Sequence, residues 1–163
     1  MIYTTKEKIE ILDTGYCLGL LYYILSLGPY PCAYVRIPQD HEFYKKDHGS
    51  IYIDVHGGLS YSKDYLLVSD NEKVDGWFIG WDYAHYGDYL GYDMLPILQQ
   101  FKENHKYDKK WSTEEIFKDV KAVCYQIRYE ESKDKLMKKK ITHNQARELL
   151  GLQKIENKGE KNE

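Results

Sequence analysis

Cysteine is scarce in this chain of 163 residues: Cys17, Cys32 and Cys124 make an odd count, and no CxxC pair occurs. This pattern excludes a disulfide framework and predicts no structural zinc site made of cysteines. The thiols are better explained as core residues than as nucleophiles, because apolar residues surround them in the sequence. Glycine-rich phosphate loops and the common hydrolase and metalloprotease signatures are also missing, so no catalytic residue is assigned.

Long hydrophobic runs are lacking as well. The longest one, residues 18–27, is interrupted by Gly19 and Ser26 and is too short to span a bilayer. The first ten residues hold no apolar stretch of the kind found in signal peptides. The sequence therefore predicts a cytoplasmic protein with no membrane segment.

The charge is small overall and uneven along the chain. The formal net charge is −3. Residues 133–163 hold nine Lys or Arg and five Asp or Glu, a net of +4, whereas residues 1–132 hold fourteen and twenty-one, a net of −7. Faces that bind nucleic acid are strongly basic, so the acidic body disfavours a nucleic-acid partner.

Phenylalanine is rare, with four copies, but tyrosine occurs 17 times. Tyrosine joins a flat apolar ring to a polar tip and is favoured on surfaces that bind a partner. A codon supply biased toward A and T explains the same excess, because lysine and isoleucine are also plentiful. The tyrosine count alone therefore decides nothing.

The first half of the chain predicts β-structure. Residues 16–25 and 32–37 are aromatic and aliphatic, and the segment between them holds glycine and two prolines, so a hairpin is the simplest interpretation; a helix over residues 18–27 is the alternative. Residues 51–56 alternate apolar and polar side chains, which predicts a strand broken by two glycines and resumed at residues 59–62. Residues 63–75 are expected to form a polar loop and residues 76–81 a further strand. Together they predict an antiparallel sheet of four to five strands.

The last third of the chain predicts helices. Ser112 and Glu115 form a capping box, and apolar residues then recur every three or four positions to Ile127, which predicts one long amphipathic helix ending near residue 131. Packed on the sheet, this helix makes an α+β domain of residues 1–131. Residues 132–163 are expected to be a basic tail with a short helix at residues 146–150 and ten disordered residues at its end. A homodimer contact in this tail would use Leu136, Leu149 and Leu150.

The first candidate site motif is the segment that contains His56, Gly57 and Gly58. His56 lies on the polar side of its predicted strand. Adjacent glycines let a ligand approach the backbone closely and leave N–H groups for an anion. The alternative is a bulge whose histidine only bonds the backbone.

The second motif places Asp82, His85 and Asp88 at three-residue spacing directly after a predicted strand. Two histidines and two aspartates from neighbouring strands suffice for acid–base chemistry or for part of a metal shell. The alternative is that Asp82 caps a turn and His85 fills a half-buried slot. We expect both motifs to converge in one concave pocket. The predicted ligand-binding residues are His56, Gly57, Gly58, Tyr61, Trp77, Trp81, Asp82, His85 and Asp88, with Tyr83 and Tyr86 as further stacking faces; no metal or cofactor is assigned.

Three segments, GPYPCAYVRIPQDHEFY, IDVHGGLSYS and WFIGWDYAHYGD, resemble blocks of a family of small proteins found mostly in bacteriophages and prophages. That family shows a Cys-Gly-Tyr-Val-like strand followed by proline, then VHGGLTY, then a stretch like GFDCAHxGD. The resemblance covers roughly residues 15–130. Ala33, Trp81 and Tyr83 stand where the family usually has Gly, Phe and Cys, which weakens any role for that last cysteine. The resemblance implies a phage origin and the host cytoplasm as location.

Two main functions of different classes follow as hypotheses. In the first, the protein binds a small ligand, most plausibly a nucleotide, and sequesters or cleaves a nucleotide signal of host immunity. In the second, it inhibits a host defence nuclease in the manner of an anti-CRISPR protein, with its acidic, tyrosine-rich surface in a basic channel. A third interpretation is a structural phage protein whose His and Asp residues only hold loops together. The sequence leaves open whether the protein is an enzyme.

Overall fold

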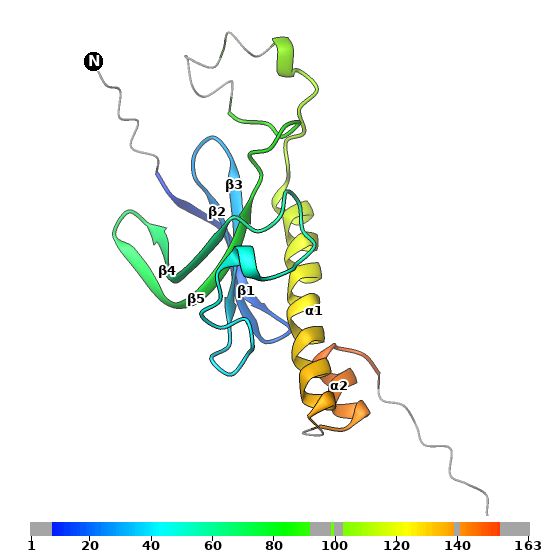
Figure 1. Cartoon of the computed structure of the whole chain (residues 1–163). Coiled ribbons are helices and arrows are strands. Elements are labelled where there is room, and N and C mark those ends of the chain that lie inside the picture. The colour runs from blue at the N-terminus through cyan, green and yellow to red at the C-terminus, as the bar shows by residue number, and fades with distance from the viewer. Residues whose placement is uncertain (1–7, 92–98, 100–102, 139–140, 154–163) are drawn as a thin grey trace, which may run out of the picture.

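The computed structural model describes residues 8–91, 99, 103–138 and 141–153. Within these ranges an antiparallel sheet has the strand order β1-β2-β3-β5-β4, and helix α1 lies along one of its faces with α2 against the end of α1 (Figure 1). The elements in chain order are β1 (Glu10–Cys17), β2 (Leu20–Ser26), β3 (Pro31–Ile37), the 3-10 turn η1 (His48–Ser50), β4 (Tyr61–Ser69), β5 (Glu72–Asp82), α1 (Thr113–Met137) and α2 (His143–Leu149). This arrangement confirms the predicted α+β class.

The strand boundaries differ from those expected at two places. The run at residues 16–25 is two strands, because Leu18 and Gly19 turn the chain with positive φ angles of 49° and 74° and join Cys17 to its partner Leu20. Residues 63–75 belong to the β4–β5 hairpin and are not a loop. The β1–β2 turn was missed because the apolar run continues through Leu18, and the β4–β5 hairpin was missed because charged residues such as Lys63, Asp64 and Lys73 interrupt its apolar pattern.

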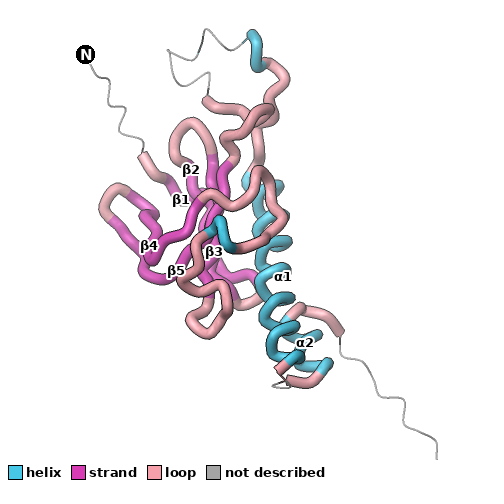
Figure 2. The backbone as a smooth tube through the Cα atoms, in the orientation of Figure 1, coloured by secondary structure: helices cyan, strands magenta, loops and turns pink. Residues whose placement is uncertain are grey.

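The predicted strand at residues 51–56 is wrong. This segment is extended but pairs with no strand of the described chain, and Figure 2 shows it as part of the loop between η1 and β4. Ile51 and Ile53 are buried in the core all the same. Alternating apolar and polar residues indicate only that one side of the segment is buried. An extended loop packed on the core produces the same alternation as a strand.

The main core lies between the sheet and α1. Strand alternation sends every second side chain of β2, β3 and β5 to this face. The helix contributes the apolar stripe that its sequence predicted. The shared set is Leu20, Tyr22, Ile24, Ala33, Val35, Ile37, Ile79, Trp81, Tyr83, Ile116, Val120, Val123, Cys124 and Ile127.

The opposite face of the sheet holds a smaller apolar cluster. The sheet curves so that its edge strands β1 and β4 approach each other, and the curved face encloses the cluster. Gly80 makes room for it, because a Cβ there would lie 2.3 Å from Cδ1 of Tyr34. The cluster consists of Leu25, Cys32, Tyr34, Leu66, Val68 and Phe78, with Tyr61 packed against it.

Helix α1 begins at the predicted capping box and extends past residue 131 to Met137. Near its end the buried Glu131 is paired with Arg128 and Lys135. Burial raises the pKa of the Glu131 carboxyl, but hydrogen bonds from Lys135 and Arg128 outweigh it and leave the pKa below its usual range.

Helix α2 starts at a capping box, Thr142 with Gln145, earlier than the short helix expected at residues 146–150, and buries Ala146. The separate tail of residues 132–163 stays a prediction, and α1 runs across its proposed boundary. The expected disorder and the last ten residues lie outside the described chain. Among the described helices, none is long and apolar enough to cross a membrane.

Candidate functional site

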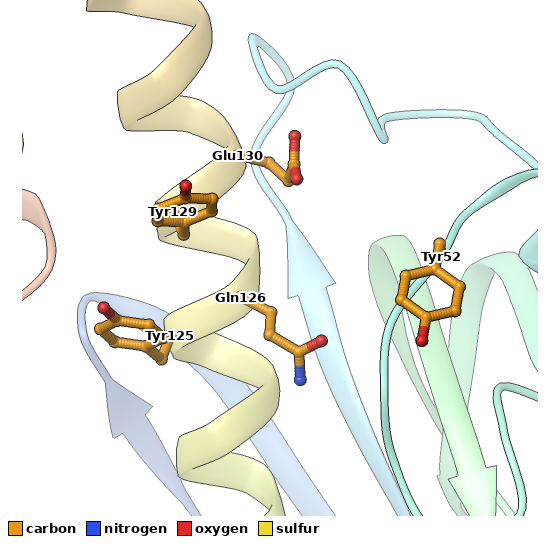
Figure 3. A pocket seen from close by; sticks show the side chains of 5 residues that line it. All are labelled: Tyr52, Tyr125, Gln126, Tyr129 and Glu130. Carbon is orange, nitrogen blue, oxygen red and sulfur yellow. The ribbon is translucent and has the colours of Figure 1, made fainter.

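The loop that carries His56 is fastened to α1. The side-chain amide of Gln126 accepts a hydrogen bond from the Asp54 N–H and donates one to the Asp54 carbonyl, both at 2.8 Å. Figure 3 shows Gln126 extending from α1 toward the loop that bears Tyr52. This double contact fixes the backbone two residues before His56, in a segment that has no strand pairing of its own.

His56 sits in a tight turn that glycine makes possible. The Gly58 N–H donates to the Val55 carbonyl at 2.9 Å, and Gly57 has a φ of +67°, which suits the third residue of a type II turn. A Cβ on Gly57 would lie 2.1 Å from Cε1 of His85. Gly57 is therefore needed twice, for the turn and for the close approach of the second histidine.

Asp82 ends strand β5 and starts the loop that carries the second motif. Its Oδ1 accepts from the Ala84 N–H at 3.2 Å, and its Oδ2 accepts from the Ser60 hydroxyl at 2.7 Å. The loop then closes on itself: the Asp88 N–H donates to the His85 carbonyl, and the His85 N–H donates to Asp88 Oδ2, both at 2.9 Å. The chain is thus wound around the Asp88 carboxylate.

The segment before α1 completes the site. Lys109 donates its N–H to the Gly87 carbonyl at 2.7 Å and accepts at its carbonyl from the Tyr89 N–H at 2.9 Å. This short parallel contact brings Trp111 over the loop, where its indole N–H donates to Asp88 Oδ1 at 2.8 Å. Trp111 is not among the site residues predicted from the sequence. The one available signal was a tryptophan directly before a helix cap.

Asp88 is the hub of the arrangement. Only 3% of the residue is exposed, and its carboxylate accepts from the His56 Nε2, the His85 N–H and the Trp111 indole. Burial raises the pKa of this carboxyl, but the three hydrogen bonds outweigh burial and leave the pKa below its ordinary value. Asp88 therefore carries a negative charge at neutral pH. Because a carboxylate only accepts, His56 donates from Nε2, at 2.7 Å.

His85 lies beside this pair with an unsatisfied nitrogen. Its Nδ1 is 3.6 Å from Asp88 Oδ2 and 3.7 Å from Asp82 Oδ1, and this buried atom makes no hydrogen bond. The ring stands edge-on to that of His56, with 5.5 Å between the ring centroids. One ligand atom each of His56, His85 and Asp88 lies within 4.8 Å of the other two. We call His56, Asp82, His85 and Asp88 the His–Asp centre.

Two aromatic rings hold the His56 imidazole in place. Tyr83 stacks on it at 4.9 Å with an angle of 8° between the ring planes, and Trp111 packs at 4.8 Å. The Tyr83 hydroxyl donates to Asp119 Oδ2 of α1 at 2.7 Å. Burial, followed by this hydrogen bond, raises the pKa of Tyr83, so the hydroxyl stays protonated and the ring stays fixed.

The structure brings the four polar residues of the prediction together, and Tyr83 with them, although Tyr83 is buried and stacks on His56 instead of on a ligand. Three other predicted aromatic residues lie elsewhere. Trp81 is buried in the main core, with its indole N–H bonded to the Tyr83 hydroxyl. Tyr61 packs against Tyr34 on the opposite face of the sheet. Trp77 lines a separate hollow with Arg36 and Pro38, roughly 17 Å along β5 from Asp82. None of the three is a wall of the His–Asp centre.

Tyr86, the residue after His85, is fully exposed. The Tyr86 ring was predicted from the sequence as a stacking face, and the fold leaves it uncovered. Gly58 is also open on its Cα side. Its N–H, however, is used by the turn, so the two glycines do not both offer donors to an anion.

A second surface feature lies between α1 and the loop that bears Tyr52. Tyr52, Tyr125 and Tyr129 are exposed and, with Gln126 and Glu130, line an open hollow between the helix and the Tyr52 loop (Figure 3). Exposed tyrosines of this kind are common where proteins meet.

Comparison with known proteins gives no relative: no protein-family model, no curated protein and no solved structure matches the chain. A functional proposal therefore depends on the chemistry of the His–Asp centre. Its donor set is that of an aspartate-oriented histidine base, and two imidazoles with a carboxylate are also a common three-residue ligand set for a metal ion.

Proposed function

We propose that the protein binds a small, phosphate-bearing ligand of the nucleotide class at the His–Asp centre. The observation that carries this proposal is the convergence of His56 with Asp82, His85 and Asp88 around one buried carboxylate. The two segments are far apart in the chain, and the sheet and helix bury their apolar residues without these polar contacts.

A purely structural role explains this cluster less well. Burying an ionised carboxylate is unfavourable by several kcal/mol unless hydrogen bonds compensate it, and structural clusters usually satisfy every buried polar atom. Here Asp88 is satisfied but the buried Nδ1 of His85 is not. The side chains of His56 and His85 also stay 26% and 38% exposed, which leaves the centre accessible to a ligand.

The nucleotide class is supported by what surrounds the centre. The exposed Tyr86 ring next to His85 offers a face on which a base stacks. His56, oriented by Asp88, is placed to move a proton if the ligand is cleaved. The resemblance to phage proteins extends the proposal to a nucleotide signal of host immunity that the protein sequesters or cleaves.

Titration calorimetry with a panel of linear and cyclic nucleotides tests the proposal, together with native mass spectrometry of protein purified from its host. His56→Ala and His85→Ala should each weaken binding at least tenfold. His85→Ala should change the free energy of unfolding by about 1 kcal/mol or less, as for other partly exposed polar groups. His56→Ala also removes a hydrogen bond from the buried Asp88 carboxylate and should lower the free energy of unfolding by roughly 1.5–3 kcal/mol. His48→Ala is the matched control, because its side chain is 37% exposed against 38% for His85 and it bonds Ser62 elsewhere. Equal affinity in all three variants would show that the ligand does not bind at this centre.

The alternative is a protein–protein inhibitor of a host nuclease, and one observation favours it. The hollow has the exposed Tyr125 and Tyr129 on α1 and the exposed Tyr52 on the loop across from the helix (Figure 3). If the protein is an inhibitor, Tyr125→Ala and Tyr129→Ala should abolish its inhibition of the nuclease, and His56→Ala should leave that inhibition intact. The nucleotide proposal requires the reverse.

A further inference from the structure

The His–Asp centre has a charge that a phosphate alone does not fit. Asp82 and Asp88 carry two negative charges, and among the described residues no Lys or Arg pairs with either of them. Lys109 lies over the Trp111 ring at 3.8 Å but is paired with Glu115. With neutral imidazoles, the centre attracts a cation and repels an anion.

The two donor-atom distances to Asp88 are close to those around a single small cation, and one ligand atom of each of the three residues lies within 4.8 Å of the other two. The His85 Nδ1 stands 3.6 Å from Asp88 Oδ2, close to the roughly 3.3 Å that separates two ligand atoms on a tetrahedral zinc ion with bonds of about 2.0–2.1 Å. The His56 Nε2 and Asp88 Oδ2 are 2.7 Å apart in their hydrogen bond and open by about half an ångström around such an ion. The neutral imidazole then carries its proton on Nδ1, which frees the Nε2 lone pair for the metal. The unsatisfied Nδ1 of His85 would gain the partner it lacks.

We propose that His56, His85 and Asp88 bind one divalent cation of the zinc class, through the His56 Nε2, the His85 Nδ1 and the Asp88 carboxylate. This inference rests on the proposed function, since it names what lets a phosphate-bearing ligand approach the two carboxylates. Three protein ligands leave an open coordination position, which a phosphate oxygen of the ligand takes. Mixed imidazole and carboxylate ligands select zinc and its transition-metal neighbours over Mg²⁺.

The groups behind the three ligands are those that metal sites use. The Trp111 indole N–H holds the second oxygen of Asp88, and Tyr83 stacks on His56 and fixes its plane. Asp82, bonded to Ser60 and the Ala84 N–H, lies 3.7 Å from the same His85 Nδ1 and so faces the proposed cation as a further carboxylate. Such outer contacts orient the ligands and change metal affinity by roughly 10–100-fold when removed.

The test uses the full chain, stripped of metal by a chelator, with Zn²⁺ and Co²⁺ as the probes and no nucleotide present. Calorimetry should give one equivalent of metal per chain. The Co²⁺ form should show visible ligand-field bands of four- or five-coordinate cobalt without a thiolate charge-transfer band, which excludes the cysteines as ligands. His56→Ala, His85→Ala and Asp88→Asn should each weaken binding on the order of 100-fold or more, and Trp111→Phe on the order of 10-fold; His48→Ala should match the wild type.

Each outcome separates the metal from the nucleotide. Wild-type protein that binds no metal, or that binds it equally well in the His56→Ala and His85→Ala variants, overturns the metal site. Nucleotide binding that survives excess chelator overturns the inferred role of the metal in holding the phosphate and leaves the proposed function standing. Metal bound at the centre with no nucleotide of the panel bound supports the site and contradicts the nucleotide. Should Asp88→Asn fail to fold by circular dichroism, the two partly exposed histidine variants still decide the question.

Discussion

A pair of glycine substitutions, Gly57→Ala and Gly58→Ala, examines the site most sharply. Both glycines have positive φ angles, +67° and +80°, so alanine is strained at either position. They differ in what the new methyl group meets. At Gly58 nothing lies within 4 Å, whereas at Gly57 the methyl group would be 2.1 Å from Cε1 of His85.

The difference between the two variants follows from these distances. The left-handed backbone alone is unfavourable for alanine by about 1–2 kcal/mol, and Gly58→Ala should lose that much free energy of unfolding. Ordinary carbon contacts are about 3.5–4.0 Å, so in Gly57→Ala the imidazole has to move by roughly 1.5 Å. That displacement adds on the order of 1–3 kcal/mol and takes His85 out of the His–Asp centre.

Urea unfolding followed by circular dichroism, with ligand and Zn²⁺ titrations beside it, measures both effects. Gly57→Ala should bind as weakly as His85→Ala, and Gly58→Ala should bind like the wild type. In the His85→Ala background the extra destabilisation by Gly57→Ala should disappear, because the ring it strikes is gone; this coupling is the diagnostic quantity. Equal stability and equal binding of the two glycine variants would refute the packing of His85 on Gly57.

Gln126→Ala removes both hydrogen bonds to the Asp54 backbone and should lower the free energy of unfolding by about 1 kcal/mol and weaken ligand binding; Gln126→Glu keeps the acceptor, so equal losses in the two variants would contradict the clamp. His41→Ala should cost roughly 2–3 kcal/mol in urea unfolding, because its buried imidazole bonds two backbone groups, while calorimetry finds ligand binding unchanged. Tyr61→Phe should also bind normally, since its ring lies across the sheet, and a tenfold loss would mean that the face assignment is wrong. Glu131→Gln should remove stability that the wild type has above the unfolded carboxyl pKa of about 4.3 and loses as the pH falls through its lower folded value; stability curves that stay parallel below pH 4.3 would argue against it.

The four polar residues of the His–Asp centre could be predicted from the sequence, and the fold brings them together. His56 and His85 each stand in a glycine-containing polar motif where a strand ends or an apolar segment breaks, and such positions need no detailed register to be recognised. The same logic failed for residues 51–56, where an extended loop held by Gln126 carries the alternation of a strand. A local sequence pattern indicates which side of a segment is buried. It does not indicate whether a neighbouring strand or another element covers that side.

Of the two rings that hold His56, Tyr83 was predicted for the site and Trp111 was not. The positions of the aromatic residues depend on strand register and on one distant contact, which the sequence pattern does not give. Trp81 shares the parity of Ile79 in β5 and so points into the core, and Tyr61 faces Gly80 and its neighbour Tyr34 across the sheet. Trp111 reaches Asp88 only through the backbone bridge between Asp88 and Lys109. No periodicity in the chain encodes that bridge.

Helix α1 and its leading residues are bonded to both halves of the site, through Gln126 to Asp54 on one side and through Trp111 to Asp88 on the other. Opening the helix therefore breaks contacts that the bound state requires. A ligand that binds only the closed form stabilises it by RT ln(1 + [L]/Kd). The exchange of the α1 amide protons with solvent should therefore slow by the factor 1 + [L]/Kd. Amide exchange in α1 thus measures whether the His–Asp centre is occupied, although the centre is made of loop residues and the helix supplies none of its ligands.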